Sequence, residues 1–250
     1  MKKIFIFVLC YLFLIINYTL ADTKTEERKF ILYIKLPLTP KIPVMELDTT
    51  LLFKKSNKYE LTFEVKTLNL VNFISSINGN GFVKGSIINS AYSTDYYKYD
   101  YKRNSKEKSI LIEYLDKKIA REAAAPSFDK SKLTPVTSNQ KDGTIDPATL
   151  FLNLLKFDKI NHCKGSLRVY DGKRRYDIVF EKKEIKNNQI VCFATQNKIG
   201  GYKKNKVSPL TKADFIKIIY KNSPNTEFIE FQAKNGFINL TIVEVRGYKD

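Results

Sequence analysis

The chain has 250 residues, which fits one large β domain or two small ones and allows a substantial core. It carries 43 Lys and Arg residues against 26 Asp and Glu residues, a formal net charge of +17 that would attract anionic polymers, lipid head groups or acidic proteins. Only seven of these cations are Arg, the residue that reads phosphates and bases in bidentate geometry, and the Lys residues are spread along the whole chain. A lysine-rich composition explains this charge, and we expect no nucleic acid partner.

Residues 1–21 have the three parts of a secretory signal peptide. Two lysines precede an apolar run over residues 4–16, and a small-x-small cleavage signal ends at Ala21. The apolar run is short for a membrane span, although an uncleaved anchor is the alternative. We therefore expect export to the periplasm and a single β-rich domain over residues 22–250.

Two cysteines, Cys163 and Cys192, remain after the leader. In an exported chain such a pair predicts a disulfide rather than a metal site, because disulfides persist in oxidising compartments. Closing a loop of this length would stabilise the fold by roughly 3–4 kcal/mol in the chain-entropy account. A free, buried pair of thiols is the alternative.

Strand patterns dominate the first half of the chain. Residues 59–65 alternate strictly and predict a half-buried antiparallel strand, while shorter β-rich runs cover residues 30–34, 47–53 and 82–88. Between them, residues 68–77 have apolar side chains at helical spacing, and the Asn-Gly repeat that follows predicts the end of this helix.

Five tyrosines lie between residues 91 and 102, just before another alternating run. On a strand Tyr97, Tyr99 and Tyr101 share one face, whereas Tyr96 points to the other. The shared row of rings is a candidate contact for a lipid, a sugar or an aromatic ligand. Ordinary cross-strand aromatic packing is the alternative.

Residues 121–145 are predicted to form a long loop, because this stretch contains prolines and shows little apolar periodicity. A loop of this length is usually functional or mobile. A helix is expected over residues 146–156, with Asp146 as its N-cap and Pro147 at its first position. Its stripe of leucines should lie across a face of the sheet.

Residues 163–180 predict a hairpin, because alternating runs flank an Asp-Gly turn at 171–172. Three cations follow the turn, where they would clamp an anion or pair with neighbouring aspartates. A turn whose charges are simply solvated is the alternative. The candidate ligand or partner contacts here are Lys173, Arg174, Arg175 and Tyr176. The next strand, at 190–194, then brings Cys192 back beside Cys163.

Three motifs stand together in the second half: the Asp-Pro helix start, the cysteine-flanked hairpin, and a Gly-Tyr pair after the second cysteine. They comprise Asp146, Pro147, Cys163, Asp171, Gly172, Arg174, Arg175, Tyr176, Cys192, Gly201 and Tyr202. In these positions the chain resembles the bacterial exported family called domain of unknown function 3108, in its proteobacterial form. The resemblance is looser over the elements that begin at Tyr59, and the lysine excess and the 121–145 loop depart from it. We include Tyr202 among the candidate contacts.

This resemblance implies an envelope protein without an assigned activity. The family's strand-rich order is similar to open, curved antiparallel sheets that wrap a helix, as in periplasmic lipoprotein carriers. Together with the alternating runs near the C-terminus, it leads us to expect a mainly β fold. The expected architecture is a curved antiparallel sheet, a half-barrel or open barrel, with one or two short helices packed on it.

Enzyme signatures are missing from the sequence. The chain has one histidine and contains no nucleophile elbow, phosphate loop or dinucleotide fingerprint. A zinc site needs three or four ligands, so we expect no metal, no cofactor and no catalytic residue. Asp95 and Asp100 leave a glycosidase-like carboxylate pair as the remaining enzymatic alternative.

Two functional hypotheses follow for what we expect to be a monomer. In the first, the chain is a periplasmic carrier or binding module whose curved sheet holds a lipid-like or other apolar ligand. In the second, it is an envelope-assembly protein that binds a protein or an anionic surface polymer through the basic hairpin. The first requires an apolar cavity on the concave face of the sheet.

Overall fold

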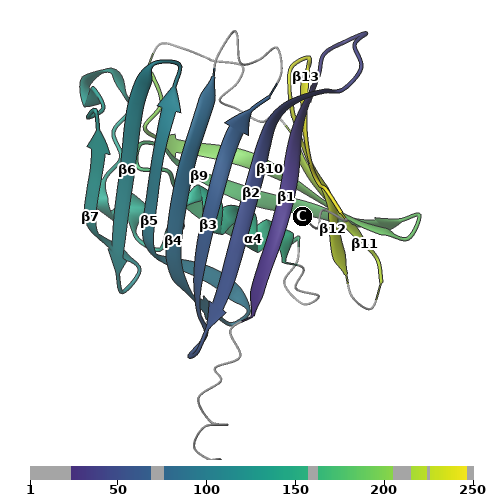
Figure 1. Ribbon diagram of the computed structural model, residues 1–250, viewed down its shortest axis with the longest axis horizontal. Helices are drawn as coiled ribbons and strands as arrows, with labels where there is room; N and C mark the ends of the chain where they lie inside the picture. Colours follow the sequence, from purple (N-terminus) through teal and green to yellow (C-terminus); the bar gives the residue numbers. More distant parts are fainter. Residues whose placement is uncertain (1–23, 69–75, 157–162, 205–214, 224–225, 247–250) are drawn as a thin grey trace, which may run out of the picture.

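The computed structural model describes residues 24–68, 76–156, 163–204, 215–223 and 226–246. Within them, thirteen strands form one antiparallel sheet in the order β7-β6-β5-β4-β3-β2-β1-β13-β12-β11-β10-β9-β8 (Figure 1). The expected mainly β fold is therefore confirmed. The strands are β1 (Thr25–Lys35), β2 (Ile42–Lys54), β3 (Lys58–Thr67), β4 (Ile77–Ile88), β5 (Ala91–Arg103), β6 (Lys106–Leu115), β7 (Lys118–Ala125), β8 (Ser166–Tyr170), β9 (Arg175–Lys186), β10 (Gln189–Gly200), β11 (Phe215–Lys221), β12 (Glu227–Asn235) and β13 (Ile238–Glu244). The helical elements are η1 (Lys130–Lys132), α3 (Ser138–Lys141) and α4 (Pro147–Leu155).

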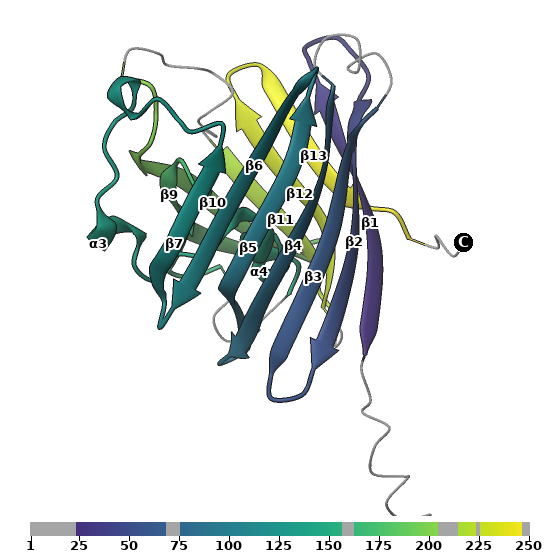
Figure 2. The ribbon, with the colours of Figure 1, turned by 60° about the vertical axis from the view of Figure 1, so that its left-hand side comes forward.

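The sheet curls around α4. In Figures 1 and 2, β1 to β7 form a broad wall on one side of this helix, and β9 and β10 pass on its other side. β1 pairs with β13, so the first and last strands lie side by side within the sheet. β7 and β8 end the sheet without pairing to each other, which leaves an open barrel.

Tight turns of two or three residues explain why several consecutive strands pair with each other. Four hairpins have positive φ at both central residues: Ser56–Asn57, Asn89–Ser90, Asp116–Lys117 and Asn187–Asn188. This is type I′ geometry, whose twist matches that of antiparallel strands and which Asn and Asp tolerate well. The predicted turn between β8 and β9 is also present, and there Gly172 has a φ of 84°.

Helix α4 lies where the sequence placed it and joins two core clusters. Leu154 packs with Phe30, Cys192 and Tyr220, whereas Leu152 packs in the cluster of Leu51, Tyr59, Leu61, Val83, Tyr97 and Ile112. Both leucines are almost fully buried, and each such side chain contributes about 2 kcal/mol to the free energy of unfolding. The centre of the open barrel is therefore filled by the helix and the inward side chains.

The Asn-Gly repeat at 78–81 was predicted to separate a helix from the strand at 82–88, but it lies inside β4. Gly81 faces Tyr99 across the β4–β5 pair, and a Cβ at this position would lie 1.9 Å from the ring of Phe63. Glycine here makes room for inward aromatic rings. The helix expected at 68–77 falls mostly on residues 69–75, which lie outside the described residues, as does the predicted leader.

The segment predicted as a loop over 121–145 is partly ordered into regular elements. Its first five residues, 121–125, complete β7 and pair with β6, although alanine is a weak strand former. The pairing to a neighbouring strand outweighs local propensity at this edge. The remainder contains η1 and α3 before Asp146 begins α4.

This same segment bridges the open side of the barrel between β7 and β8. The amide of Gly143 donates to the carbonyl of Lys117 in the turn just before β7 (2.7 Å), and Ile145 forms a parallel bridge with Val169 of β8. On the β7 side, Glu122 accepts from the Tyr170 hydroxyl (2.9 Å) and pairs with Lys141 (2.6 Å). Figure 2 shows α3 at this open side. We call this region the seam.

Cys163 and Cys192 form a disulfide, as the sequence predicted. Their Cα atoms are 5.0 Å apart, and both side chains are buried in the core cluster that contains Leu154. The bond attaches the segment that leads into β8 to the first third of β10. It therefore fixes the position of the short end strand of the sheet.

Candidate functional site

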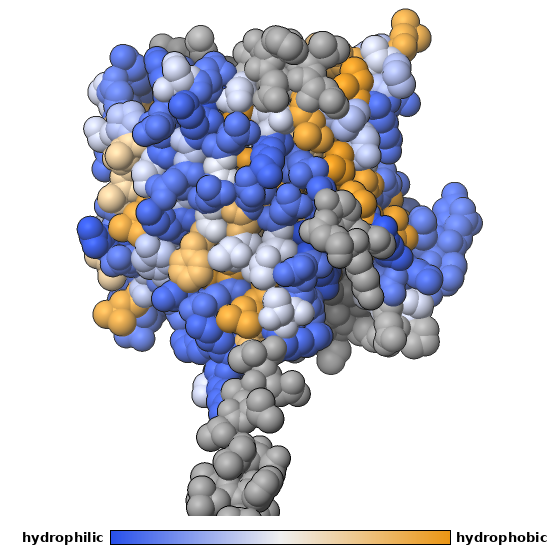
Figure 3. Space-filling view, viewed as in Figure 1, coloured by the Kyte–Doolittle hydropathy of each residue, from blue (hydrophilic) through white to orange (hydrophobic). Residues whose placement is uncertain are grey.

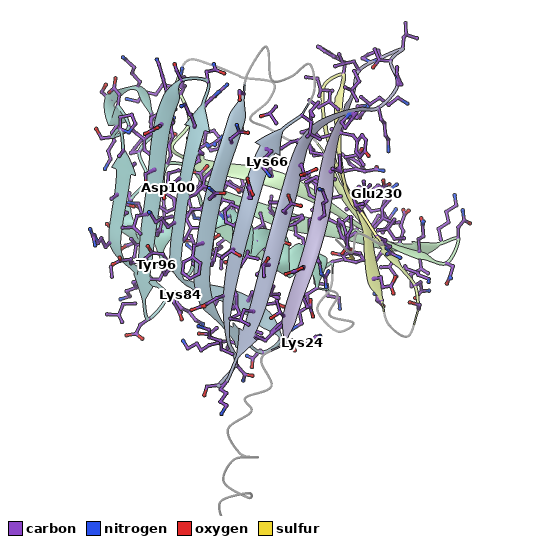
Figure 4. The ribbon with its side chains drawn as sticks, viewed as in Figure 1. Lys24, Lys66, Lys84, Tyr96, Asp100 and Glu230 are labelled. Atoms are coloured by element: carbon purple, nitrogen blue, oxygen red, sulfur yellow. A yellow bond between two sulfur atoms is a disulfide. The ribbon has the colours of Figure 1, made fainter. Side chains whose placement is uncertain are left out.

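Two adjoining hollows open at the end of the barrel where α4 ends. The first, of about 390 Å³, is lined by Lys24, Glu26, Arg28, Thr49, Leu51, Phe53, Tyr92, Leu152, Leu155, Lys156 and Thr226. The second, of about 460 Å³, is lined by Glu26, Glu27, Arg28, Leu155, Thr226, Glu227, Phe228, Glu244 and Arg246. We call the two together the α4 mouth. In Figure 4, Lys24 marks its position at the lower end of β1.

Inward charges on β1 create the mouth. Phe30 is fully buried, and because side chains alternate along a strand, Arg28 and Glu26 share its inward face. Charges on an inward face are costly unless they are paired. Glu26 accordingly accepts from Lys24 (2.7 Å) and Arg28 (2.9 Å), and Arg28 also approaches Glu244 (3.8 Å).

The floor of the first hollow is apolar. Leu51, Tyr92 and Leu152 are each less than a tenth exposed, and two cations stand over aromatic rings at its edge. Lys24 Nζ lies 5.6 Å from the ring centre of Phe53, and Lys156 Nζ lies 5.2 Å from that of Tyr92. The hollow thus combines an apolar floor with a cationic rim, the arrangement that an amphipathic anion requires.

The ionisation states of the mouth follow from burial and pairing. Burial opposes ionisation of Glu26, but the hydrogen bond from Lys24 and the charge of Arg28 outweigh it and lower the pKa of this carboxyl. Burial, together with the charge of Glu26, raises the pKa of Tyr92 to about 12. Glu26 is therefore ionised and Tyr92 keeps its proton near neutral pH, so the first hollow carries three cations against one carboxylate.

The second hollow has the opposite charge balance. Its lining includes four glutamates and two arginines, so it is acidic where the first hollow is cationic. The Glu26–Arg28 pair lies on the border between them, since both residues line both hollows. An anion is therefore attracted to one half of the α4 mouth and repelled by the other.

The basic residues of the predicted hairpin lie at the seam and contact the chain itself. Arg175 is 3% exposed, and its guanidinium donates to the carbonyls of Gln140 and Tyr176 (both 2.6 Å) and pairs with Asp177. Arg174 is about half exposed and pairs with Asp171 within the turn (2.8 Å). Lys173 is half-buried, with its ammonium 5.2 Å from the ring centre of Phe128.

The predicted tyrosines gather behind this turn. Tyr97 is buried, and the rings of Tyr99 and Tyr101 stack with their centres 4.8 Å apart. Tyr96 packs instead against Phe82 at 6.1 Å. Burial raises the pKa of Tyr97 and of Tyr176 far above the ordinary value, and the nearby charge of Asp171 adds to both shifts. Cross-strand packing, the alternative weighed from the sequence, accounts for these contacts.

Tyr202 joins the same group because Gly201 brings the backbone close to the turn. A Cβ on Gly201 would lie 1.9 Å from the carbonyl oxygen of Lys173, so only glycine permits this approach. Burial raises the pKa of Tyr202 to about 12. Its hydroxyl is buried and has no hydrogen-bond partner within the described part of the chain. The hairpin residues and Tyr202 are thus brought together at the seam, whereas the α4 mouth contains none of the predicted contacts.

Sequence reasoning missed the α4 mouth, although a signal was present. Glu26 and Arg28 stand in phase with Phe30, so extending the strand toward the N-terminus would have placed two charges on the inward face. The prediction began this strand only at residue 30. The contributions of α4 and β5 to the mouth depend on the packing of distant elements, and no local pattern reveals them.

No family model matches the chain, the domain of unknown function 3108 family included, and no curated protein matches it. A solved structure that the chain is similar to is the β-barrel-like protein of domain of unknown function DUF1849 from Brucella abortus. The two share 8% sequence identity, with a TM-score of 0.43 over 90% of this chain and 97% of the other. A likeness this distant carries no functional argument.

Among the described residues, no three His, Cys, Asp or Glu side chains gather as a metal site would require. Nor does this part of the chain contain a helix that is both long and apolar enough to cross a membrane.

Proposed function

We propose that the chain is a non-enzymatic binding module of the bacterial envelope, and that it holds an amphipathic anion in the cationic hollow of the α4 mouth. The observation that supports this most directly is the apolar floor of Leu51, Tyr92 and Leu152 beside the cations Lys24 and Lys156. At about 390 Å³, the hollow lies within the usual range of small-molecule sites, roughly 300–1,000 Å³.

The envelope location is part of this proposal. It is supported by the signal-peptide pattern of residues 1–21 and by the buried disulfide, a bond that persists in oxidising compartments. Membership of the domain of unknown function 3108 family is proposed on the motifs of the second half alone.

The filled centre of the barrel determines where a ligand can lie. Leu152 and Leu154 of α4 occupy the space that a lipid would take inside the curved sheet. An apolar chain would therefore lie at the end of the barrel against Leu51, Phe53 and Leu155, with its acidic head group near Lys24 and Lys156. No movement of the helix is required.

The alternative, an assembly protein that grips a partner through the basic hairpin, receives less support. Arg175 is buried and holds α3 and β9 together through Gln140 and Asp177. Reversal of its charge would therefore test folding rather than binding. Lys173 and Arg174 are the cations of the turn that a partner could reach.

Binding of dodecyl phosphate to the purified protein tests the proposed site. We expect the double variant Lys24→Glu/Lys156→Glu to weaken dodecyl phosphate binding by about tenfold or more, because it reverses two rim charges. Binding of the neutral detergent dodecyl maltoside should change little. Lys118→Glu, an exposed lysine of β7 remote from the mouth, is the matched control. Equal affinities for all three proteins would contradict the proposal, as would a failure to bind either probe.

A further inference from the structure

A groove crosses the far end of the sheet from β3 to β7, away from the α4 mouth. One hollow of about 570 Å³ is lined by Glu64, Asn78, Gly79, Asn80, Asp100, Tyr101, Lys102, Glu107, Lys108, Ser109, Ala125 and Pro126. A second, of about 180 Å³, is lined by Tyr101, Lys108, Ser109, Ile110, Ala125, Pro126, Ser127, Phe128 and Asp129. Because the two share five residues, they form one continuous groove, which we call the rim groove.

The strand register explains the polar part of the groove. Glu64, Asn80, Asp100, Ser109 and Ala125 are successive partners across β3, β4, β5, β6 and β7, so they form one straight row on the outward face. A second row, of Asn78, Lys102 and Glu107, lies beside it. Both rows present hydrogen-bonding groups without a large apolar side chain. In Figure 3 this outward face is mostly hydrophilic, and Figure 4 labels Asp100 on it.

The smaller hollow provides a different chemistry. β7 ends at Ala125, and beyond that residue the groove passes the edge of the sheet and reaches the inward side chains of β6. Lys108 stands there with its ammonium 6.0 Å from the ring centre of Tyr101, and Lys173 stands over Phe128. Lys108, Tyr101 and Phe128 therefore line this hollow, and Lys173 lies next to it against the ring of Phe128.

The charges near this hollow are left without full compensation. Burial and the charge of Arg174 lower the pKa of Lys173, and Lys203 and Lys108 lower it further, against one opposing carboxylate, Asp171. Asp129 lines the hollow, but its carboxylate accepts from Ser131 (2.6 Å) and pairs with Lys132 (2.9 Å). Over its whole length the rim groove is lined by four carboxylates and two lysines, so an acidic group is attracted only at this end, where Lys108 lines the hollow and Lys173 stands over Phe128.

We propose that the rim groove binds an acidic saccharide: the outward row of Glu64, Asn80, Asp100 and Ser109 bonds its hydroxyl groups, and Lys108 with Lys173 receives its carboxylate or phosphate. Carboxylate and amide side chains at strand spacing offer many acceptors and donors for hydroxyls. Tyr101 and Phe128 supply flat apolar walls for the faces of sugar rings. Glu64, Asp100 and Glu107 would repel a polyanion such as a nucleic acid or an acidic peptide, so a single acidic group among many hydroxyls fits best.

Calorimetric titration with 3′-sialyllactose, a trisaccharide with a single carboxylate, and with the neutral maltotriose tests this inference. We expect the acidic trisaccharide to bind more tightly than the neutral one, and Lys108→Gln to remove at least about tenfold of its affinity. Asn80→Ala should weaken binding of both sugars, because it removes an amide that contacts hydroxyls. Lys106→Gln is the matched control, since this exposed lysine lies on the same strand but lines neither hollow.

The outcomes are distinguishable from those at the α4 mouth. Lys24→Glu/Lys156→Glu should leave 3′-sialyllactose binding unchanged, because those residues lie outside the rim groove. Unaltered thermal unfolding of Lys108→Gln would show that a lost affinity is not a lost fold. Equal affinity for the two sugars, no binding of either, or an equally tight Lys108-dependent binding of a polyglutamate peptide would each overturn the proposal.

Discussion

At the scale of single residues, Asp146 is unusual because its carboxylate is fully buried. It accepts from the amides of Ala148 (2.8 Å) and Thr149 (3.0 Å), which makes it the N-cap of α4. The hydroxyls of Thr94 and Thr149 donate to its other oxygen. Burial nevertheless raises the pKa of Asp146 above its ordinary value of 3.8, although these hydrogen bonds act against the shift. The carboxylate that caps and positions α4 is thus also a charge whose burial is unfavourable.

The variant Asp146→Asn separates the cap from the charge. A carboxyl whose pKa is higher in the folded than in the unfolded state stabilises the protein at pH values below the pKa of the unfolded state. This contribution is lost as the pH rises through the pKa of the folded state. We therefore expect the free energy of unfolding of the wild type, measured with urea, to fall relative to that of Asp146→Asn as the pH rises from about 4 to 7. The Asn side chain still accepts from both amides. Parallel stability profiles for the two proteins would show that Asp146 titrates normally.

At the scale of elements, the β8–β9 hairpin is held by close packing of its turn. Gly172 lies against β6, where a Cβ would stand 2.5 Å from Ile110, and Gly201 lies against the carbonyl of Lys173. These two approaches place the turn between the end of β10 and the inward face of β6. The hairpin therefore closes the seam without a ladder of hydrogen bonds between β7 and β8.

Two glycine substitutions test how tightly the β8–β9 turn is packed. Gly201 has a φ of 81° and a backbone oxygen in the path of a Cβ, whereas Gly165 has a φ of 71° with open space around it. We expect Gly165→Ala to cost about 1 kcal/mol in the free energy of unfolding, and Gly201→Ala about 3 kcal/mol or more, because it adds a clash to the same conformational strain. Urea unfolding compares the two. Similar losses would mean that the turn is not tightly docked.

The elements show where sequence reasoning succeeds. Alternation located the strands around Tyr59 and Ile190, the Asp-Gly pair located a hairpin, and Asp146 with Pro147 located α4, because each of these signals is local. The prediction that the Asn-Gly repeat interrupts the chain before the strand at 82–88 was wrong, because the role of these glycines is not local: they make room for rings on β3 and β5. The strand-forming end of the predicted loop depends likewise on its pairing with β6.

In the candidate sites, too, the sequence revealed what local motifs encode and missed what depends on distant strands. The hairpin cations and Tyr202 were found from local motifs and are close together at the seam, but their contacts are mostly internal. Neither hollow of the α4 mouth nor the row from Glu64 to Ala125 was predicted. Each requires the register of several strands, and a one-residue change of register would move every side chain of that strand to the other face.

At the scale of the whole molecule, the barrel consists of two up-and-down halves, β1 to β7 and β8 to β13. They join through the β1–β13 pair, whose partners are more than two hundred residues apart, as in Phe30 and Glu244. At the seam they meet through side chains and single bridges. The disulfide lies wholly in the second half, where it holds β8, a strand of five residues, to β10.

This position predicts what removal of the disulfide would do. The double variant Cys163→Ala/Cys192→Ala should lose roughly 3–4 kcal/mol of unfolding free energy in the chain-entropy account. Hydrogen exchange should increase first at β8 and the seam, because β8 is a sheet edge that the bond attaches, while β1 to β5 keep their ladders. Wild-type protein treated with reductant should behave like the variant. If exchange rose uniformly over the sheet, or if stability stayed at the wild-type level, the bond would not be what holds the end of the barrel in place.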